Sequence, residues 1–261
     1  MTAHERGGAD RAAYERTKRV LDVLVAALML VVTSPIMLAI AVVIVATIGR
    51  PVLFRQIRPG RHGELFEMVK FRTMRPVDAT GGAVSDSERL TPLGRSLRAT
   101  SLDELPTLWN VVRGEMSLVG PRPLLVEYLD RYTPTEARRH EVRPGITGLA
   151  QVRGRNALTW GEKFANDVWY VDHRGLSLDL YILAETVGAV LRRRGITAPG
   201  SPTAPEFVGT TEMPDRATQM PDLADEMPDR ATGMPDRAGA TRDLTSSRGG
   251  ATHRPAGWLA G

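Results

Sequence analysis

The chain contains no cysteine, which excludes disulfides, thiolate catalysis and metal sites built on thiolates. Its five histidines are scattered singly and do not form the HExxH spacing of zinc proteases. The sequence also lacks the GxxxxGK(S/T) phosphate loop, an isolated GxGxxG fingerprint and the GxSxG elbow of serine hydrolases. The sequence therefore gives no support for a nucleotide-binding phosphate loop or for a serine hydrolase.

Acidic residues are outnumbered in most of the chain. The 261 residues have a net charge of +4, but residues 201–261 hold six arginines and nine acids, so residues 1–200 carry +7. A basic body suits an anionic membrane surface, a phosphorylated substrate or nucleic acid. Aromatic residues are only 5% of the chain and are not interleaved with the arginines, which makes nucleic acid the poorest of the three.

The longest hydrophobic run lies near the N-terminus, where residues 23–46 are 24 consecutive residues without a charge. As one helix they would measure about 36 Å, enough for the ~30 Å hydrocarbon core of a bilayer, so we expect membrane contact. Thr33, Ser34 and Pro35 lie at the centre of the run. Pro35 removes a backbone donor, and the hydroxyls of Thr33 and Ser34 can satisfy the freed carbonyls.

Basic residues flank this run on both sides. Arg6, Arg11, Arg16, Lys18 and Arg19 precede it, and Arg50, Arg55, Arg58 and Arg61 follow it. Because positive charge marks the cytoplasmic side, we favour a re-entrant helix that turns at Ser34 and Pro35 over a plain span. A cleaved signal peptide is a third alternative, but the run is longer than the usual apolar region of such peptides.

Further along, three segments have clear patterns. Residues 52–74 predict a β-hairpin around Pro59-Gly60, with Lys70 in its second strand. Residues 160–173 and 176–195 predict helices, the second ending in three arginines and a glycine. At 261 residues and 42% hydrophobic, the chain is long enough for one domain with a sizeable hydrophobic core and an appendage.

Asp103 and Glu104 stand side by side in the mostly apolar stretch SLDELPTLWNVVRGEMSLVGPRP, residues 101–123. Ser101 and Glu104 have the spacing of a capping box, although Pro106 would then fall inside the first turns of the helix. If the helix begins near Pro106 instead, both acids lie just outside it. The pattern alone leaves capping and a chemical role open.

Arginine and glycine are combined in two nearby places. Prolines on both sides of Arg122 restrict its backbone, which favours phosphate recognition over a surface ion pair. Residues 143–156 hold three glycines and three arginines, and such glycines allow a backbone to approach a ligand closely, although many loops of this kind are only turns.

The composition changes from about residue 199. A heptapeptide beginning MPD recurs from Met213, Met220, Met227 and Met234. A proline in every repeat forbids a continuous helix, and there is no apolar stripe to bury. We therefore expect a disordered tail that carries no chemistry.

Five stretches together resemble a known family: SPIMLAIAVVI, KFRTM, TSLDELPTLWNVVRGEMSLVGPRPL, VRPGITGLAQVRGRN and DLYILAETVGAVL. From about Lys18 to Gly195 the chain resembles the bacterial monotopic phosphoglycosyl transferases, also called bacterial sugar transferases. PLLVEYLDRY and GRNALTW look closest to the small, single-domain members that act on N-acetylated sugars such as diacetylbacillosamine.

The resemblance implies an α-rich α+β fold and a monotopic membrane protein. It would consist of an N-terminal polar segment (1–17), a re-entrant membrane helix (18–50), a cytoplasmic phosphoglycosyl transferase domain with amphipathic interfacial helices and a small β-hairpin (51–198), and a disordered repeat tail (199–261). It would lie in the bacterial inner membrane with the domain facing the cytoplasm.

The resemblance also implies an activity: transfer of a sugar-1-phosphate from a UDP-sugar, N-acetylated in the closest members, to undecaprenyl phosphate with release of UMP. It makes Asp103 the nucleophile, which forms a phosphosugar-aspartyl intermediate, and it makes Glu104, together with Asp103, the holder of Mg²⁺. The substrate phosphates would be bound by four basic residues, Lys70, Arg98, Arg122 and Arg155.

A protein of another class is the alternative. A non-catalytic scaffold anchored in the membrane could use the same basic body to bind anionic lipid, with Asp103 and Glu104 acting only as helix caps. That hypothesis gives the proline-flanked Arg122 no purpose.

Overall fold

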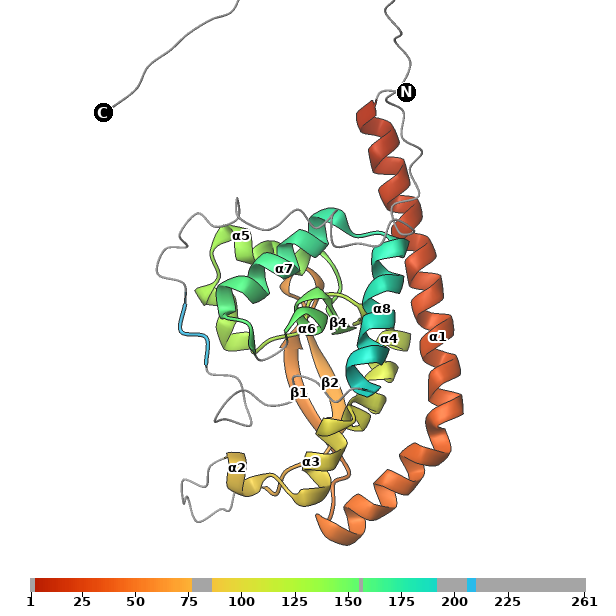
Figure 1. Ribbon diagram of the computed structural model, residues 1–261, viewed down its shortest axis with the longest axis vertical. Helices are drawn as coiled ribbons and strands as arrows, with labels where there is room; N and C mark the ends of the chain where they lie inside the picture. The colour runs from red at the N-terminus through yellow and green to blue at the C-terminus, as the bar shows by residue number, and fades with distance from the viewer. Residues whose placement is uncertain (1–2, 77–85, 155–156, 192–205, 210–261) are drawn as a thin grey trace, which may run out of the picture.

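The structure is a computed structural model that describes residues 3–76, 86–154, 157–191 and 206–209 (Figure 1). One long helix, α1, runs along one side of a domain built of short helices and two small sheets. The elements after α1 (Ala3–Thr47) are β1 (Leu53–Pro59), η1 (Arg61–Gly63), β2 (Leu65–Phe71), α2 (Asp86–Arg89), α3 (Pro92–Ala99), η2 (Leu102–Thr107), α4 (Leu108–Arg113), β3 (Ser117–Val119), η3 (Val126–Arg131), α5 (Pro134–Ala137), η4 (Arg138–Glu141), β4 (Gly145–Thr147), α6 (Leu149–Arg153), α7 (Trp160–His173) and α8 (Leu176–Leu191).

Helix α1 is continuous over 45 residues although it contains Pro35. The hydroxyl of Ser34 donates to the carbonyl of Val31 at 2.7 Å, which is the carbonyl that Pro35 leaves without its helical donor. Thr33 donates to the carbonyl of Met29 at 2.6 Å. The predicted compensation is confirmed for Ser34, whereas Thr33 bonds a carbonyl that Pro35 does not leave free. Residues 3–17 of the predicted polar segment are helical and continuous with the apolar run, since α1 begins at Ala3.

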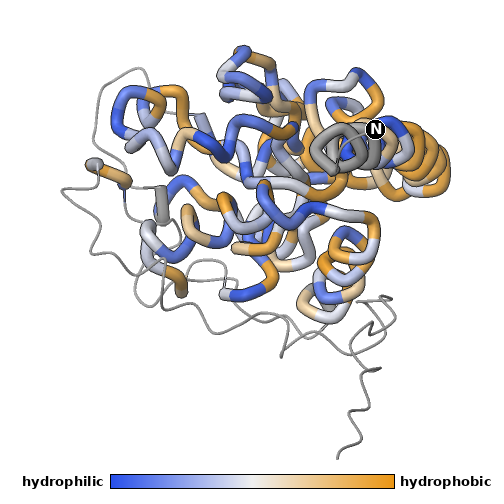
Figure 2. Tube along the Cα trace, turned by 90° about the horizontal axis from the view of Figure 1, so that it is seen from above, coloured by the Kyte–Doolittle hydropathy of each residue, from blue (hydrophilic) through white to orange (hydrophobic). Residues whose placement is uncertain are grey.

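The surface of α1 is apolar to an unusual degree. Residues 11–47 form a helix long and apolar enough to cross a membrane, and only 6% of its most apolar window is buried within the protein. Leu24, Leu28, Val31 and Leu38 are each more than 60% exposed. Figure 2 shows this helix as a largely orange coil at the edge of a body of mixed colour. Such a surface is typical of a helix that contacts a membrane or another protein.

The N-terminal part of α1 is joined to the domain by buried polar contacts. Tyr14 and Lys18 both donate to the Asp179 carboxylate on α8, each at 2.9 Å. One turn further along, Asp22 accepts a hydrogen bond from the Ser117 hydroxyl on β3 at 2.7 Å. Asp22 and Asp179 are each only 5% exposed. These contacts fix the register of α1 on the domain.

The later part of α1 rests on the same domain through apolar packing. Ala26 packs with Val111 of α4 and Phe66 of β2 in one buried cluster. Ile40 and Ile44 belong to a second cluster with Phe71 and Leu97. Figure 1 shows the orange end of α1 running obliquely to the red part and passing beneath the domain. Both ends of the apolar stretch are therefore held by one domain.

The predicted hairpin is confirmed. Strands β1 and β2 pair antiparallel from Leu53 opposite Phe71 to Pro59 opposite Leu65. A second, parallel pair joins β3 and β4, far apart in the sequence, with Ser117 opposite Gly145. The description as α-rich with a small hairpin agrees with this architecture.

Two glycines of the loop 143–156, Gly145 and Gly148, lie where two backbones meet. A Cβ on Gly145 would lie 2.1 Å from the amide nitrogen of Gly120, and one on Gly148 would lie 2.2 Å from the carbonyl oxygen of Gly120. Both glycines are needed because two protein backbones meet there. Close approach of this loop to a ligand stays a prediction.

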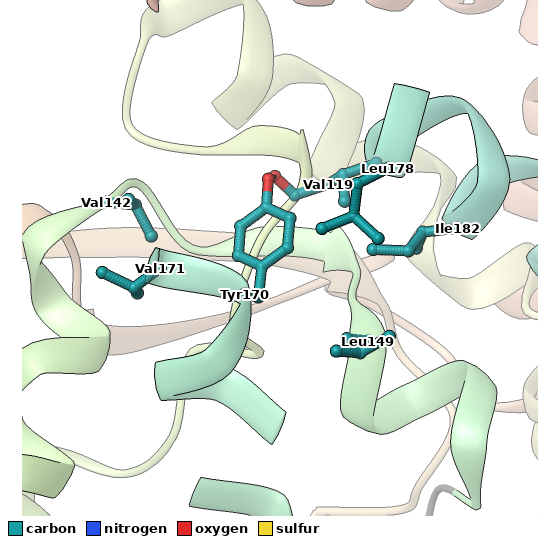
Figure 3. Packing of buried hydrophobic residues seen from close by; sticks show 7 residues of the cluster. All are labelled: Val119, Val142, Leu149, Tyr170, Val171, Leu178 and Ile182. Atoms are coloured by element: carbon teal, nitrogen blue, oxygen red, sulfur yellow. The ribbon is translucent and has the colours of Figure 1, made fainter. Parts of the chain in front are cut away.

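Helices α7 and α8 enclose the core of the domain. Thr159 and Glu162 form a capping box that begins α7 at the predicted residue. Tyr170 is 2% exposed and lies among the side chains shown in Figure 3, and its hydroxyl donates to Asp179 at 2.7 Å. Helix α8 begins at Leu176 as predicted, and its predicted C-terminal cap at 192–195 lies outside the described residues.

Only residues 206–209 of the predicted tail are described. They differ from the expected disorder, because the side chain of Phe207 is 2% exposed. Phe207 joins a cluster of buried aromatic residues with Tyr128 and Phe164. Disorder of the remaining tail stays a prediction.

Candidate active site

A cleft of about 760 Å³ opens on the domain and holds the acidic pair. Its walls come from α1 at Met29, the hairpin, η2, the segment after β3, and α7. The charged residues that line it include Arg58, Lys70, Arg98, Asp103, Glu104, Arg122, Arg139, Lys163 and Asp167. Cations outnumber acids in this group, so the cleft suits an anionic ligand.

The Glu104 carboxylate forms ion pairs with two basic residues. Its Oε1 accepts hydrogen bonds from Lys70 at 2.6 Å and from Arg122 at 3.0 Å. Burial alone would raise the pKa of Glu104, but the charges of Lys70 and Arg122 and their hydrogen bonds outweigh it and lower the pKa to about 2. Burial lowers the pKa of Lys70, and the attraction of Glu104 offsets only part of that. Glu104 is therefore ionised at neutral pH.

Asp103 is placed differently from its neighbour. It is 8% exposed, and within the described part of the chain no hydrogen bond or ion pair holds its carboxylate. Burial and then the charge of Glu104 raise its pKa, while Lys70, Arg98 and Arg122 oppose that shift. Asp103 therefore lines the basic cleft with its carboxylate unpaired among the described residues.

The capping interpretation of this pair is wrong. Ser101 has a left-handed backbone with φ of 56° and makes no side-chain capping hydrogen bond. The Glu104 carboxylate turns instead to Lys70 and Arg122. Both acids lie in the first turn of a 3₁₀ helix, η2, and the regular helix α4 begins only at Leu108, beyond Pro106.

Buried hydrogen bonds join η2 and α4 to the strand that carries Lys70. Thr107 donates to the carbonyl of Val69 at 2.9 Å. The Asn110 side chain accepts from the amide of Val69 at 3.1 Å and donates to the carbonyl of Glu67 at 2.7 Å. Thr107 and Asn110 are each no more than 2% exposed. The separation between Lys70 and Glu104 is thus set by backbone-anchored contacts.

A buried ion pair that the sequence did not indicate, between Arg139 and Asp167, holds the backbone of Arg122. Arg139 donates twice to one oxygen of Asp167, at 2.7 and 3.0 Å, and once to the carbonyl of Arg122 at 2.7 Å. Arg139 is 3% and Asp167 4% exposed. The two residues are 28 positions apart, so no local pattern announces the pair.

Two further basic residues line the cleft. Arg98, on α3, donates through Nε to the hydroxyl of Thr73 at 3.1 Å, which leaves the rest of its guanidinium for other contacts. In the sequence Arg58 is only one of the charges that flank the apolar run, but in the fold its buried Nε has no hydrogen-bond partner among the described residues. Burial and the nearby Arg122 lower the pKa of Arg58 to about 10. Arg155, the fourth predicted phosphate ligand, lies outside the described residues.

The residues present fit a partial site for Mg²⁺. In the ranges that the structure describes, no group of three or more histidines and acids converges. Asp103 and Glu104 supply two adjacent carboxylates, and Glu104 is held ionised. Mg²⁺ commonly takes one or two protein carboxylates and completes its shell with substrate phosphates and water.

Comparison with known proteins gives a consistent result. The family model described as bacterial sugar transferase matches residues 13–193. The chain is 50% identical over 197 residues to an uncharacterized sugar transferase, EpsL, of Bacillus subtilis, covering 75% of this chain and 98% of that protein. It is 41% identical over 202 residues, 73% of this chain and 76% of the relative, to the UDP-glucose:undecaprenyl-phosphate glucose-1-phosphate transferase of Caulobacter vibrioides. It is 37% identical over 196 residues, 68% of this chain and 41% of the relative, to the undecaprenyl-phosphate galactose phosphotransferase of Salmonella typhimurium. The acidic pair in a basic cleft beside an apolar helix thus lies in a chain that belongs to the bacterial sugar transferase family.

Proposed function

We propose that this protein transfers a sugar-1-phosphate from a UDP-sugar to undecaprenyl phosphate and releases UMP. The names of its relatives in Caulobacter and Salmonella support this reaction class. The observation that carries the proposal is the unpartnered Asp103 carboxylate next to Glu104, inside a cleft lined by basic residues. A scaffold that only binds lipid would have no use for a buried carboxylate without a partner.

Asp103 acts as the nucleophile in this proposal. A carboxylate oxygen of Asp103 bonds to the β-phosphorus of the UDP-sugar while the bond from that phosphorus to the bridging oxygen breaks, and UMP leaves with the electron pair. A phosphate oxygen of undecaprenyl phosphate then attacks the same phosphorus and releases Asp103 as a carboxylate. The two steps form a sugar diphospholipid and restore the enzyme.

The basic residues of the cleft bind and orient the phosphates. Lys70 and Arg122 both contact the Glu104 carboxylate. When a diphosphate binds, its oxygens can take over part of these contacts, so neither cation is left without an anionic partner. Arg98 and Arg58 have donors not used by the described residues. We assign phosphate binding to these four residues together with Arg155.

Asp103 and Glu104 would hold Mg²⁺. When bound, the ion neutralises diphosphate oxygens that would otherwise repel an anionic nucleophile. Glu104 in turn stays ionised because Lys70 and Arg122 stabilise its charge.

The lipid substrate would reach the cleft from the membrane. Met29 of α1 and Phe54 of β1 line the cleft that also holds Asp103, and Phe54 is 46% exposed. The cleft therefore extends from the helix with the most apolar surface to the acidic pair. This arrangement suits a substrate with a long apolar tail and a phosphate head.

The function is tested with purified protein in detergent, undecaprenyl phosphate and a panel of UDP-sugars, with UMP release as the readout. We expect UMP only when both substrates are present, and a covalently bound sugar phosphate when the lipid is omitted. The panel includes glucose and galactose, which appear in the names of the relatives, and the N-acetylated sugars that the sequence favours. No UMP with any donor would leave the lipid-binding scaffold as the better hypothesis.

We also propose that α1 is re-entrant and that the domain lies on the cytoplasmic side. The contacts at Lys18 and Ile44 support this topology, because both parts of α1 pack on one domain. A straight crossing would carry one of these parts away from it.

Single cysteines at Ala12 and Glu64 test this topology in a chain that has no cysteine of its own. Both positions are exposed in the structure. In intact cells, an impermeant thiol reagent should label neither position, and after permeabilisation it should label both. Labelling of one position and not the other in intact cells would establish a full span.

A further inference from the structure

The segment 206–209 is seated in a socket of aromatic side chains. Phe207 is 2% exposed, whereas its neighbour Val208 is 83% exposed, so the contact is specific to one side chain. The ring centroid of Phe207 lies 5.0 Å from that of Phe164 and 5.5 to 5.9 Å from those of Tyr128, Trp160 and Tyr132. These four rings come from η3, the residue after it, and α7.

The backbone of this segment is held as well. The amide of Phe207 donates to the Tyr128 hydroxyl at 3.1 Å. The guanidinium of Arg131 donates to the carbonyl of Phe207 and to the Glu206 carboxylate, the latter at 2.8 Å. Polar contacts on both sides of the ring fix its depth in the socket.

Two rings of the socket, those of Tyr132 and Phe164, also contact Arg139, which supports Arg122 in the active cleft. The guanidinium of Arg139 lies over the rings of Tyr132 and Phe164, 5.7 and 5.6 Å from their centroids, and donates to the Tyr132 hydroxyl at 3.2 Å. The same guanidinium donates to the carbonyl of Arg122, whose side chain contacts Glu104. Each step of this chain is a direct contact, buried at Arg139 and exposed where Arg122 meets Glu104.

We propose that Phe207 is a positioning residue for the active cleft. By filling the socket it holds Tyr132 and Phe164 against Arg139, which in turn fixes the backbone of Arg122. The part of this inference that concerns catalysis rests on the proposed function. The inference also moves the C-terminal limit of the domain from residue 198, the predicted boundary, to at least Gly209.

Three substitutions in the full chain test the proposal: Phe207→Ala, Phe207→Leu and, as the matched control, Val208→Ala. Phe207→Ala should lower kcat for UMP release about tenfold or more at a temperature where the protein is folded, because small displacements of substrate-binding groups are costly. Phe207→Leu keeps most of the apolar volume and should lose less. Val208→Ala should stay within about twofold of the wild type, because an exposed side chain contributes little.

Hydrogen–deuterium exchange supplies a readout that needs no substrate. In Phe207→Ala the four amides within residues 120–125 (Pro121 and Pro123 have none) should exchange faster than in the wild type, and in Val208→Ala they should not. Unchanged exchange there, or a kcat for Phe207→Ala equal to that of Val208→Ala, would overturn the proposal.

Two other outcomes are also decisive. If Phe207→Ala does not fold, Phe207→Leu decides: wild-type kcat and wild-type exchange at residues 120–125 would reduce Phe207 to a structural role and reject the proposal. If the wild type is inactive with every donor, the proposed function fails, and the exchange data alone establish or reject the coupling of Phe207 to Arg122.

Discussion

Asp103→Asn should abolish transfer, with a loss of at least about a thousandfold in kcat. An amide can neither attack phosphorus nor carry a phosphoryl intermediate. The fold should survive, because the asparagine has nearly the same shape and no described contact depends on the charge of Asp103. Loss of a helix cap alone would cost only about 0.5–2 kcal/mol and leave the chemistry nearly normal.

The measurement uses a UDP-sugar labelled in its β-phosphate, without lipid, followed by quenching and peptide mapping. Label should appear on the tryptic peptide 99–113 of the wild type and be missing from Asp103→Asn. Asp130→Asn, at an exposed aspartate, is the matched control and should be labelled normally. Sequential kinetics without any covalent label in the wild type would remove Asp103 from the role of nucleophile.

Glu104→Gln is expected to reduce kcat by about a hundredfold or more while the label on Asp103 is partly retained. The neutral amide would leave Lys70 and Arg122 close together without their shared anion. It would also weaken the binding of Mg²⁺, so part of the activity should return at high Mg²⁺ concentration.

Activity against Mg²⁺ concentration is the measurement for this variant, with Glu64→Gln, at an exposed glutamate, as control. Thermal unfolding is recorded in parallel, because removing one member of a buried charge cluster also destabilises the fold. A variant within about threefold of the wild type at every Mg²⁺ concentration would show that Glu104 serves neither the metal nor the cations.

Regular patterns in the sequence identified the regular elements. The alternation in residues 65–71 predicts a strand, and β2 occupies those residues. Residues 160–173 predict a helix, and α7 occupies those residues. Both signals are local, so a single sequence is enough to detect them.

The acidic pair was recognised from the sequence, but its geometry was not. Whether Ser101 caps a helix depends on its backbone angle. Its left-handed φ of 56° lies directly after the C-cap of α3, so Ser101 ends that helix and does not cap the next one. Gly145 looked like a ligand-binding glycine because the sequence does not say which backbone approaches it, and here that backbone is Gly120.

Contacts between distant residues were missed for a related reason. Arg139 and Asp167 are ordinary charged residues in polar surroundings until folding buries them together. Phe207 was overlooked because one aromatic residue among prolines, threonines and acids resembles linker composition. Its four aromatic partners lie 43 to 79 positions earlier in the chain.

The buried contact between Lys18 and Asp179 also sets an order of events during synthesis. The two residues are 161 positions apart, so at 5–20 residues per second Asp179 emerges from the ribosome roughly 8–32 s after Lys18. In that interval the apolar part of α1 has already been made, and only a short-range partner, Asp22 at 3.8 Å, is available to Lys18. Helix α1 can therefore be complete before the domain on which it packs exists, and its contact with Asp179 forms only once α8 has been made.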